Sequence, residues 1–150
     1  MKKVIVILST LVLTVALAAC GNSAAELYAW EVGSESSLDV SETADISLVE
    51  GSQTPTGVKI KIHNPTEIRY CYGAEFSIEV WQDNAWYTMT AGPGLDATAE
   101  ERFVDPGASK EEEYSWPSSL SPGKYRLLKE LYPEDSPEHT VWVSTEFIIE

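Results

Sequence analysis

The stretch that decides the fold is Leu120-Ser121-Pro122-Gly123-Lys124-Tyr125, close to the C-terminal end of a chain of 150 residues. Leu120 is expected to face a core, and Pro122-Gly123 is expected to form the corner that leads into a strand. Tyr125 enters that strand two residues later, where its ring can be buried while its hydroxyl bonds back to the preceding backbone. A generic Pro-Gly turn before a strand remains the alternative interpretation.

Short segments of alternating apolar and polar residues surround this corner. In Val58-Lys59-Ile60-Lys61-Ile62-His63 the aliphatic residues share one face, which is the period-2 pattern of a half-buried strand. Similar strands are expected at residues 44–48, 75–82, 86–89, 102–104, 111–116, 124–129, 140–143 and 145–149. The chain has 8 Pro and 9 Gly, and no segment keeps a 3.6-residue period. The sequence therefore predicts an all-β sandwich of about seven strands.

The corner and several other motifs together resemble a bacterial immunoglobulin-like domain, found in extracellular proteins and often in lipoproteins of Gram-positive bacteria. The resemblance covers residues 43–150, and its motifs are Asn64-Pro65-Thr66, Tyr72 to Glu79, Trp86, Pro106 to Ser109, Trp116 and Pro122 to Arg126. It implies an immunoglobulin/fibronectin-type-III-like β-sandwich in which Tyr125, Pro122 and Gly123 form a structural tyrosine corner. The chain lacks the Cys pair that staples antibody domains. The motifs are structural and identify no site.

Residues 1–19 have the layout of an export signal. Two basic residues are followed by an apolar run over residues 4–16, which is short for a spanning helix. Leu17-Ala18-Ala19-Cys20, followed by Gly21, resembles the bacterial lipobox. That resemblance implies cleavage between Ala19 and Cys20 and acyl chains such as palmitate on the Cys20 thiol. Two acyl chains hold a protein stably at a bilayer, so we expect a lipid-anchored protein on the extracytoplasmic face of the cell membrane. An ordinary signal peptide with an incidental Cys20 is the alternative.

Residues 20–42 are rich in Ser, Ala and acidic side chains, and we expect them to form a tether between the lipidated Cys20 and the domain at residues 43–150. Leu27, Tyr28 and Trp30 are unusual for a pure linker. They either dock on the domain as a first strand or contact a partner.

The charge of the chain excludes some partners. Its formal net charge is −14, and removal of Lys2 and Lys3 with the signal leaves 8 basic against 24 acidic residues, a net of −16. Nucleic-acid binding depends on basic residues, so we expect no nucleic-acid partner. The expected role of this negative charge is to keep an exposed domain soluble. The alternative explanation, which is more specific, is that it attracts a cationic partner or Ca²⁺.

No motif with catalytic or metal-binding spacing is present, and we expect neither a catalytic residue, nor a metal, nor a cofactor. Paired carboxylates are usually a solvated face, although a Ca²⁺ site in the acidic loops near Asp96, Glu100 and Glu101, or near Glu134 and Asp135, is left open. Lipidation of Cys20 would leave Cys71 without a disulfide partner, and a buried, inert thiol is expected there.

Aromatic residues offer the best candidates for recognition, with 5 Trp and 7 Tyr in the chain. Trp30, Trp81 and Trp142 are the candidate partner contacts, because exposed aromatics can stack on sugar rings or anchor a protein. Cover for sheet faces or edges is the alternative. The preferred function is a non-enzymatic module for binding or scaffolding at the cell surface, with a surface protein or glycan as partner. A carboxylate-dependent cell-wall hydrolase, and an envelope sensor or accessory subunit of a membrane enzyme, are the alternatives.

Overall fold

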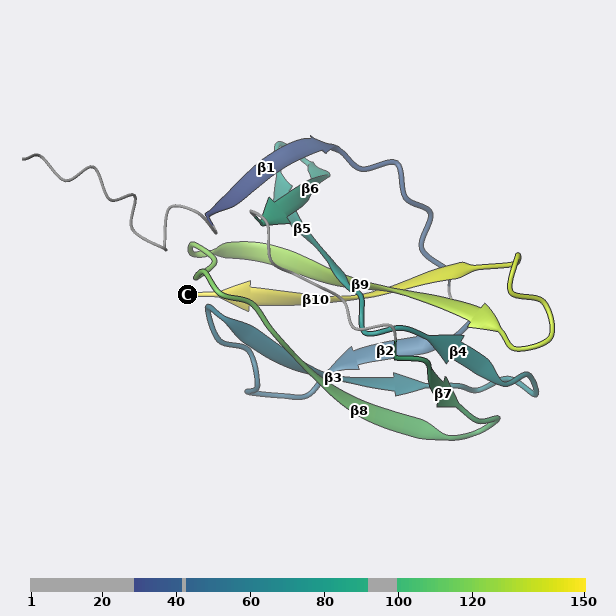
Figure 1. Cartoon of the computed structure of the whole chain (residues 1–150). Helices are drawn as coiled ribbons and strands as arrows, with labels where there is room; N and C mark the ends of the chain where they lie inside the picture. Colours follow the sequence, from purple (N-terminus) through teal and green to yellow (C-terminus); the bar gives the residue numbers. More distant parts are fainter. Residues whose placement is uncertain (1–28, 42, 92–99) are drawn as a thin grey trace, which may run out of the picture.

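Ten strands in two sheets form the described part of the chain (Figure 1). The computed structural model describes residues 29–41, 43–91 and 100–150, and no helix within them is long and apolar enough to cross a membrane. The strands are β1 (Trp30–Glu35), β2 (Asp45–Leu48), β3 (Gly57–His63), β4 (Tyr70–Tyr72), β5 (Ser77–Gln82), β6 (Ala85–Ala91), β7 (Arg102–Val104), β8 (Ser109–Ser115), β9 (Gly123–Pro133) and β10 (Val141–Ile149). The predicted all-β sandwich is confirmed.

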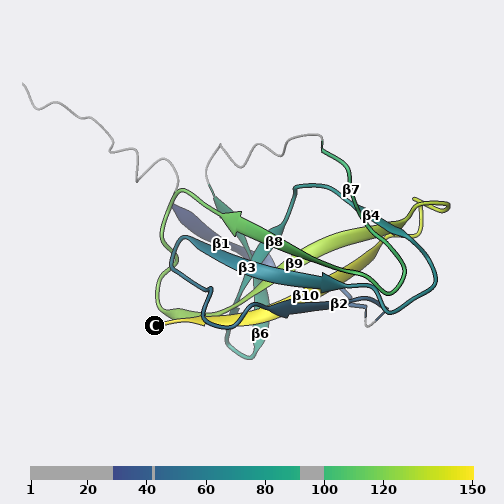
Figure 2. The ribbon, with the colours of Figure 1, turned by 90° about the horizontal axis from the view of Figure 1, so that it is seen from below.

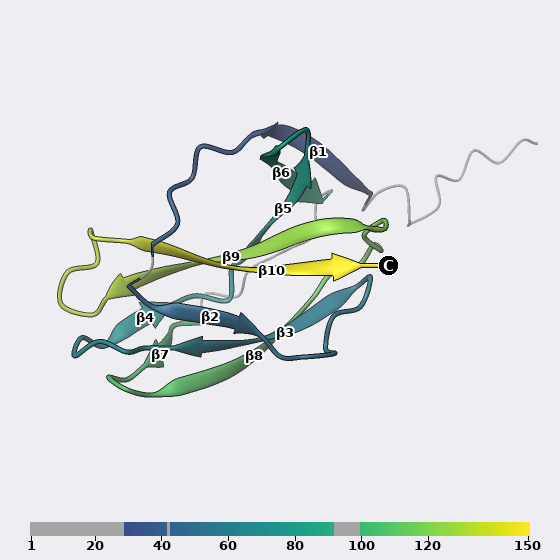
Figure 3. The ribbon, with the colours of Figure 1, turned by 180° about the vertical axis from the view of Figure 1, so that it is seen from behind.

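The two sheets differ in size. The larger has the order β1-β6-β5-β9-β4-β7, with β10 paired to the other edge of β9, and the smaller has the order β2-β3-β8. Every strand pair is antiparallel. Views from below and from behind show the smaller sheet stacked against β9 and β10 (Figures 2 and 3). Apolar side chains from the facing sides of both sheets fill the space between them, including Ile60, Ile62, Leu127, Leu131 and Val143.

The corner before β9 has the geometry expected of it. The hydroxyl of Tyr125 donates a hydrogen bond to the carbonyl of Ser121 at 2.8 Å. Its buried ring stacks on Phe147 with a centroid separation of 5.8 Å. This is the back-bond that defines a tyrosine corner, and it fixes the start of β9 against β10.

The β5–β6 hairpin shows why the predicted turn forms. Asp83 and Asn84 both have positive φ, at 50° and 64°. Positive φ at both central residues is typical of a type I′ turn, whose twist matches that of the two flanking strands. Asp and Asn are among the few residues that tolerate positive φ. The turn brings Trp81 against Trp86, with ring centroids 5.0 Å apart.

The segment from Trp30 to Glu35, which we expected within the tether while leaving open that Trp30 docks as part of a first strand, forms β1 and pairs with β6. Its Ser, Gly and Glu content gives no strand signal, and five of its six residues are exposed. Pairing with β6 and the indole of Trp30 hold it in place: Nε1 donates to the carbonyl of Ser118 at 2.9 Å, and the ring packs edge-on against Trp116. Of the other residues expected in the tether, 20–28 and 42 lie outside the described residues, whereas 29 and 36–41 are described.

Residues 36–41 then lead from β1 to the start of β2, beside the outward side of the larger sheet (Figure 1). The amide of Ser36 donates to the carbonyl of Trp86 at 2.8 Å, and the amide of Ser41 donates to the carbonyl of Trp142 at 2.6 Å. Leu38 is half-buried and lies with Leu128 along the same hollow. This segment helps to explain why Leu128, on the outward side of β9, is fully buried.

Candidate functional site

The larger sheet divides along one edge of β9. β5 pairs with residues 125–128 of β9, and β4 pairs with Tyr132 and Pro133 on the same edge. β10 pairs continuously with the other edge from Gly123 to Leu131. The three residues from Lys129 to Leu131 therefore face the connection between β4 and β5 in place of a strand. We call the hollow at this point the fork pocket.

Lys129 closes the floor of the fork pocket. It is 1% exposed and lies in the core-facing row of β9 with Leu127 and Leu131. Its ammonium donates to the carbonyl of Gly73 at 2.8 Å and to the carbonyl of Glu75. These two carbonyls belong to the connection between β4 and β5, so the lysine takes the place of ladder hydrogen bonds that the missing strand would have made.

Aromatic rings surround the same ammonium on its inner side. The ring centroids of Tyr72 and Tyr114 lie 5.4 Å and 5.5 Å from its nitrogen. At these distances a cation is attracted by the ring faces. Burial nevertheless lowers the pKa of Lys129 from 10.5 to about 8, with Glu75 opposing and Arg102 adding to that lowering. Lys129 is therefore a desolvated cation held by two carbonyls and two rings.

The fork pocket itself has a volume of about 390 Å³. Its polar rim is made of four carboxylates, and its apolar walls are aromatic. The carboxylates are those of Glu75, Glu100, Glu101 and Glu130, and the aromatic walls are Phe76, Tyr132 and Trp142. All four glutamates are exposed. A hollow with aromatic walls and a few convergent polar groups is the usual form of a binding site, and here the balance of charge is negative.

A hydrogen-bond network lies behind the rim. Glu112 accepts from the hydroxyl of Tyr72 at 2.8 Å and from Arg102 at 2.5 Å, and Arg102 also donates to Glu100 at 3.0 Å. Burial and the neighbouring Glu112 carboxylate raise the pKa of Tyr72 above its usual value. The network connects the rim to the buried Lys129 region through one arginine.

Tyr114 lies on the opposite sheet, and burial raises the pKa of its hydroxyl. The residue is 5% exposed, and among the described residues its hydroxyl has no hydrogen-bond partner. An unpaired buried hydroxyl is unusual. The carboxylates of Glu112 and Glu75 add to the rise in its pKa, which places the hydroxyl in the same acidic surroundings as Lys129.

The three candidate tryptophans lie in different settings. Trp30 is engaged inside the domain by Ser118 and Trp116, so its contact is intramolecular. Trp142 is half-buried and forms a wall of the fork pocket. Trp81 is 38% exposed and lies beside Lys124, whose ammonium is 5.4 Å from the indole centroid. The structure brings none of the three together.

The candidate residues for lipidation, for the tether contact and for Ca²⁺ binding do not form a common site either. Ala19, Cys20 and Asp96 lie outside the described residues, as do Leu27 and Tyr28. Glu134, left open as a Ca²⁺ ligand, is paired with Arg69 at 3.0 Å. Within residues 29–41, 43–91 and 100–150, no three His, Cys, Asp or Glu side chains gather as a metal site requires.

The free thiol of Cys71 is buried in β4. Burial raises its pKa, and the charges of Glu101 and Glu134 add to that rise. A thiol with a raised pKa holds little thiolate at neutral pH, and the thiolate is the nucleophilic form. The environment of Cys71 is therefore that of an inert, packed side chain.

Sequence reasoning missed Lys129, and it did not connect Glu100 and Glu101 with Trp142. One signal was available for Lys129, because alternation along β9 places it on the same face as Tyr125 and Leu127. A lysine in an otherwise apolar row indicates a buried cation with a special partner. The fork itself depends on pairings between distant strands, and no local pattern predicts them.

Comparison with known proteins gives a family and a few distant structural likenesses. The ApaA protein from Bordetella pertussis is 13% identical, with a TM-score of 0.36 over 82% of this chain and 89% of that one. The archaellum periplasmic stator protein FlaG from Sulfolobus acidocaldarius is 12% identical, with a TM-score of 0.40 over 67% of this chain and 98% of that one. Such low TM-scores carry no argument about function. A search among curated proteins found no match.

The family comparison is more informative. Residues 40–147 match the family described as Bacterial Ig-like domain, which is well over half of the chain. The match contains the smaller sheet, the fork pocket and most of the larger sheet, whereas β1 precedes it and the last two residues of β10 follow it. The chain belongs to the bacterial Ig-like domain family.

Proposed function

We propose that this chain is a lipid-anchored Ig-like module that binds a partner molecule at the extracytoplasmic face of the cell membrane. The lipobox at residues 17–20 supports the anchor, and membership of the bacterial Ig-like family supports a role in surface binding or scaffolding. Fold alone does not identify a partner, so the partner has to be argued from the site.

The fork pocket is the binding site in this proposal, and a cationic side chain is its ligand. The single observation that carries this is a hollow with four carboxylates at its rim and aromatic side chains along its walls. An arginine or lysine entering the hollow would exchange its hydration for the carboxylates of Glu101 and Glu130 and for the face of Trp142. A protein segment that displays such a residue is the partner we favour over a glycan.

The same carboxylates fit binding better than hydrolysis. Glu100 accepts from Arg102, and Glu101 accepts from the hydroxyl of Tyr132 at 3.0 Å. Glycoside hydrolysis needs one carboxyl that holds a proton for the leaving group, opposite a second that is ionised. Glu100 and Glu101 both serve as hydrogen-bond acceptors for neighbouring side chains, which supports a binding role.

The test is a titration of the mature lipoprotein in detergent with a tetra-arginine peptide, followed by calorimetry. The double variant Glu101→Gln/Glu130→Gln should weaken binding by about tenfold, which corresponds to about 1.4 kcal/mol. The matched control is Glu31→Gln/Glu111→Gln, which removes the same charge from exposed positions on β1 and β8. The control should bind as the parent does. Equal weakening in both variants would mean that only net charge attracts the peptide, and the pocket would be rejected.

A further inference from the structure

The two ends of the sandwich carry different charges. One end, which we call the near end, is formed by residues 49–56 between β2 and β3 and by residues 116–122 between β8 and β9. Glu50 is the one charged residue in these two loops. The opposite end, which we call the far end, is formed by residues 64–69, 105–108 and 134–140. Its loops carry one cation and five acids, namely Arg69 with Glu67, Asp105, Glu134, Asp135 and Glu138.

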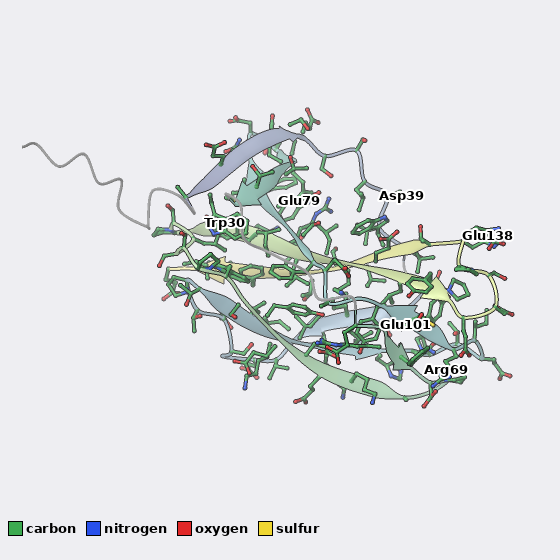
Figure 4. All side chains as sticks on the ribbon, in the orientation of Figure 1. Trp30, Asp39, Arg69, Glu79, Glu101 and Glu138 are labelled. Carbon is green, nitrogen blue, oxygen red and sulfur yellow. The ribbon has the colours of Figure 1, made fainter. Side chains whose placement is uncertain are left out.

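The described chain starts at the near end. The indole of Trp30 is bonded to Ser118 and packed on Trp116, both in or beside the loop that precedes β9. In Figure 4, Trp30 lies at one end of the molecule, while Arg69 and Glu138 lie at the other. The expected anchor at Cys20 is only nine residues before Ala29.

The length of that connection limits how the domain can stand on a membrane. Nine residues span at most about 30 Å, even when fully extended. β9 runs from the near end to the far end over 11 residues, which is roughly 33 Å at the rise of a strand. The loop at residues 134–140 extends beyond the end of β9. If the far end touched the lipid, Ala29 at the near end would stand more than about 30 Å above the bilayer. With Cys20 in the bilayer, the connection from Cys20 to Ala29 is too short to reach that height, so an inverted domain is excluded.

The near end also offers apolar surface. A hollow of about 610 Å³ opens there between β1 and the loop before β9, lined by Trp30, Val32, Met89 and Pro117 among others. Val32 is 49% exposed. Acidic groups at or beside this end include Glu31, Glu50 and Glu150, so some charge is present. The far end would meet an anionic headgroup layer with five carboxylates, and like charges repel within a Debye length of about 8–10 Å.

We propose that the near end rests against the lipid surface that holds Cys20, with the loops 49–56 and 116–122 and the hollow at Val32 facing the headgroups. The bilayer is the occupant of this surface. The far end and the fork pocket then face away from the membrane, toward a cationic partner. This inference rests on the lipid anchor of the proposed function and adds to it a fixed orientation.

The experiment measures the distance of each end from the membrane. The lipidated chain, with Ser119→Cys at the near end or Thr140→Cys at the far end, is labelled with an environment-sensitive fluorophore. Each is reconstituted in vesicles of phosphatidylcholine and phosphatidylglycerol that contain a headgroup-attached nitroxide quencher. The unsubstituted chain is the labelling blank, since its Cys71 is buried. We expect the label at Ser119 to be quenched severalfold more strongly than the label at Thr140.

The outcomes separate the two proposals. Equal quenching at both ends would mean that the domain lies on its side or moves freely, and stronger quenching at Thr140 would mean that it is inverted. Either result overturns the orientation while leaving the anchor intact. Flotation of the chain with the vesicles, compared with Cys20→Ala, tests the anchor alone. If the parent chain fails to float, the anchor and the orientation fall together.

Discussion

The two halves of β9 hold their cations in different ways. Arg126, in the half that has a strand on each side, meets the buried carboxylate of Glu79, with Nε 2.6 Å from Oε2, and lies over the ring of Trp86. Lys129, three residues further on, meets two backbone carbonyls at the point where β5 gives way to β4. The first cation completes a closed pair inside a continuous sheet. The second supports the edge of an opening, so one strand serves stability in one half and the candidate site in the other.

The largest expected effect comes from breaking the closed pair. Arg126→Met leaves the carboxylate of Glu79, which is 3% exposed, without its cation. A buried charge without a partner costs about 3–5 kcal/mol, and the free energy of unfolding measured in urea should fall by that amount.

The double variant Glu79→Leu/Arg126→Met serves as its control. It replaces both charges by apolar side chains and should recover most of the loss, because apolar substitutes for a buried pair are often neutral. If Arg126→Met alone costs less than about 1 kcal/mol, the pair is hydrated and the contrast between the two halves of β9 is wrong.

Lys129→Met should cost less than Arg126→Met. It leaves the carbonyls of Gly73 and Glu75 without a donor, and an unsatisfied buried group costs about 1–3 kcal/mol. Water in the adjacent hollow can hydrate part of that loss, which is why the cost stays below that of the closed pair. Urea unfolding at pH 7 measures it. A larger loss than for Arg126→Met would show that the lysine stabilises the whole sheet and not only the fork.

The pH dependence of stability should also identify Lys129. Its pKa is about 8 when folded and 10.5 when unfolded, so between these values the unfolded chain binds more protons and stability rises with pH. The rise is at most about 3 kcal/mol. Above about pH 10 stability should fall, because the pKa values of Tyr72 and Tyr114 are raised in the folded state and the unfolded chain loses those protons first.

Urea unfolding between pH 7 and pH 11 tests this shape. Lys129→Met should remove the rise and keep the fall, whereas Lys61→Met, at an exposed position of β3, should keep both. A parent chain that loses stability steadily from pH 8 upward would contradict the lowered pKa of Lys129.

A smaller effect is expected at the corner that starts β9. Tyr125→Phe removes the hydroxyl that donates to Ser121 and leaves the stacked ring in place. The loss should be about 1 kcal/mol in chemical denaturation, the usual net value of one hydrogen bond. Tyr132→Phe, which removes an exposed bond to Glu101, is the comparison. It should cost less than half as much, and equal costs would show that the corner has no special role.

The smallest effect on stability is expected at the rim of the opening. Glu101→Gln/Glu130→Gln should change the free energy of unfolding by no more than about 0.5 kcal/mol, as surface substitutions usually do. The same variant is the one expected to weaken peptide binding. A large loss of stability here would mean that the rim stabilises the fold. The half of β9 beside Lys129 would then serve stability as well, and the contrast between the two halves would be wrong.

Local patterns predicted most of the fold. The alternation over residues 58–63 became β3 at Gly57–His63, and the turn at Asp83-Asn84 became a hairpin with two positive φ angles. Two segments expected separately, 140–143 and 145–149, form the single strand β10, because Ser144 continues the pairing with β9. These features depend on neighbouring residues, which a sequence displays directly.

The remaining features depend on contacts between distant segments. β4 is only three residues long and is held by β7 and β9. β1 has no apolar alternation and is positioned by β6 and by Trp116. The fork pocket combines residues from the segments 73–77, 100–101 and 129–132 with Trp142, so its acids and its aromatic walls meet only after the sheet has formed.

The pairing of β1 with β6 has a consequence for crowding. A sheet edge left open would invite a neighbouring copy to add its own strand, and the proposed lipid anchor would confine copies to a plane where encounters are frequent. β1 closes that edge: Gly33 lets its backbone approach Thr88, where a Cβ would stand 2.5 Å from the hydroxyl oxygen. Its own outer edge is short, carries Glu31 and Glu35, and shifts register between Val32 and Glu35. Under the proposed anchoring, β1 would thus discourage fibril-like stacking among copies held at one membrane.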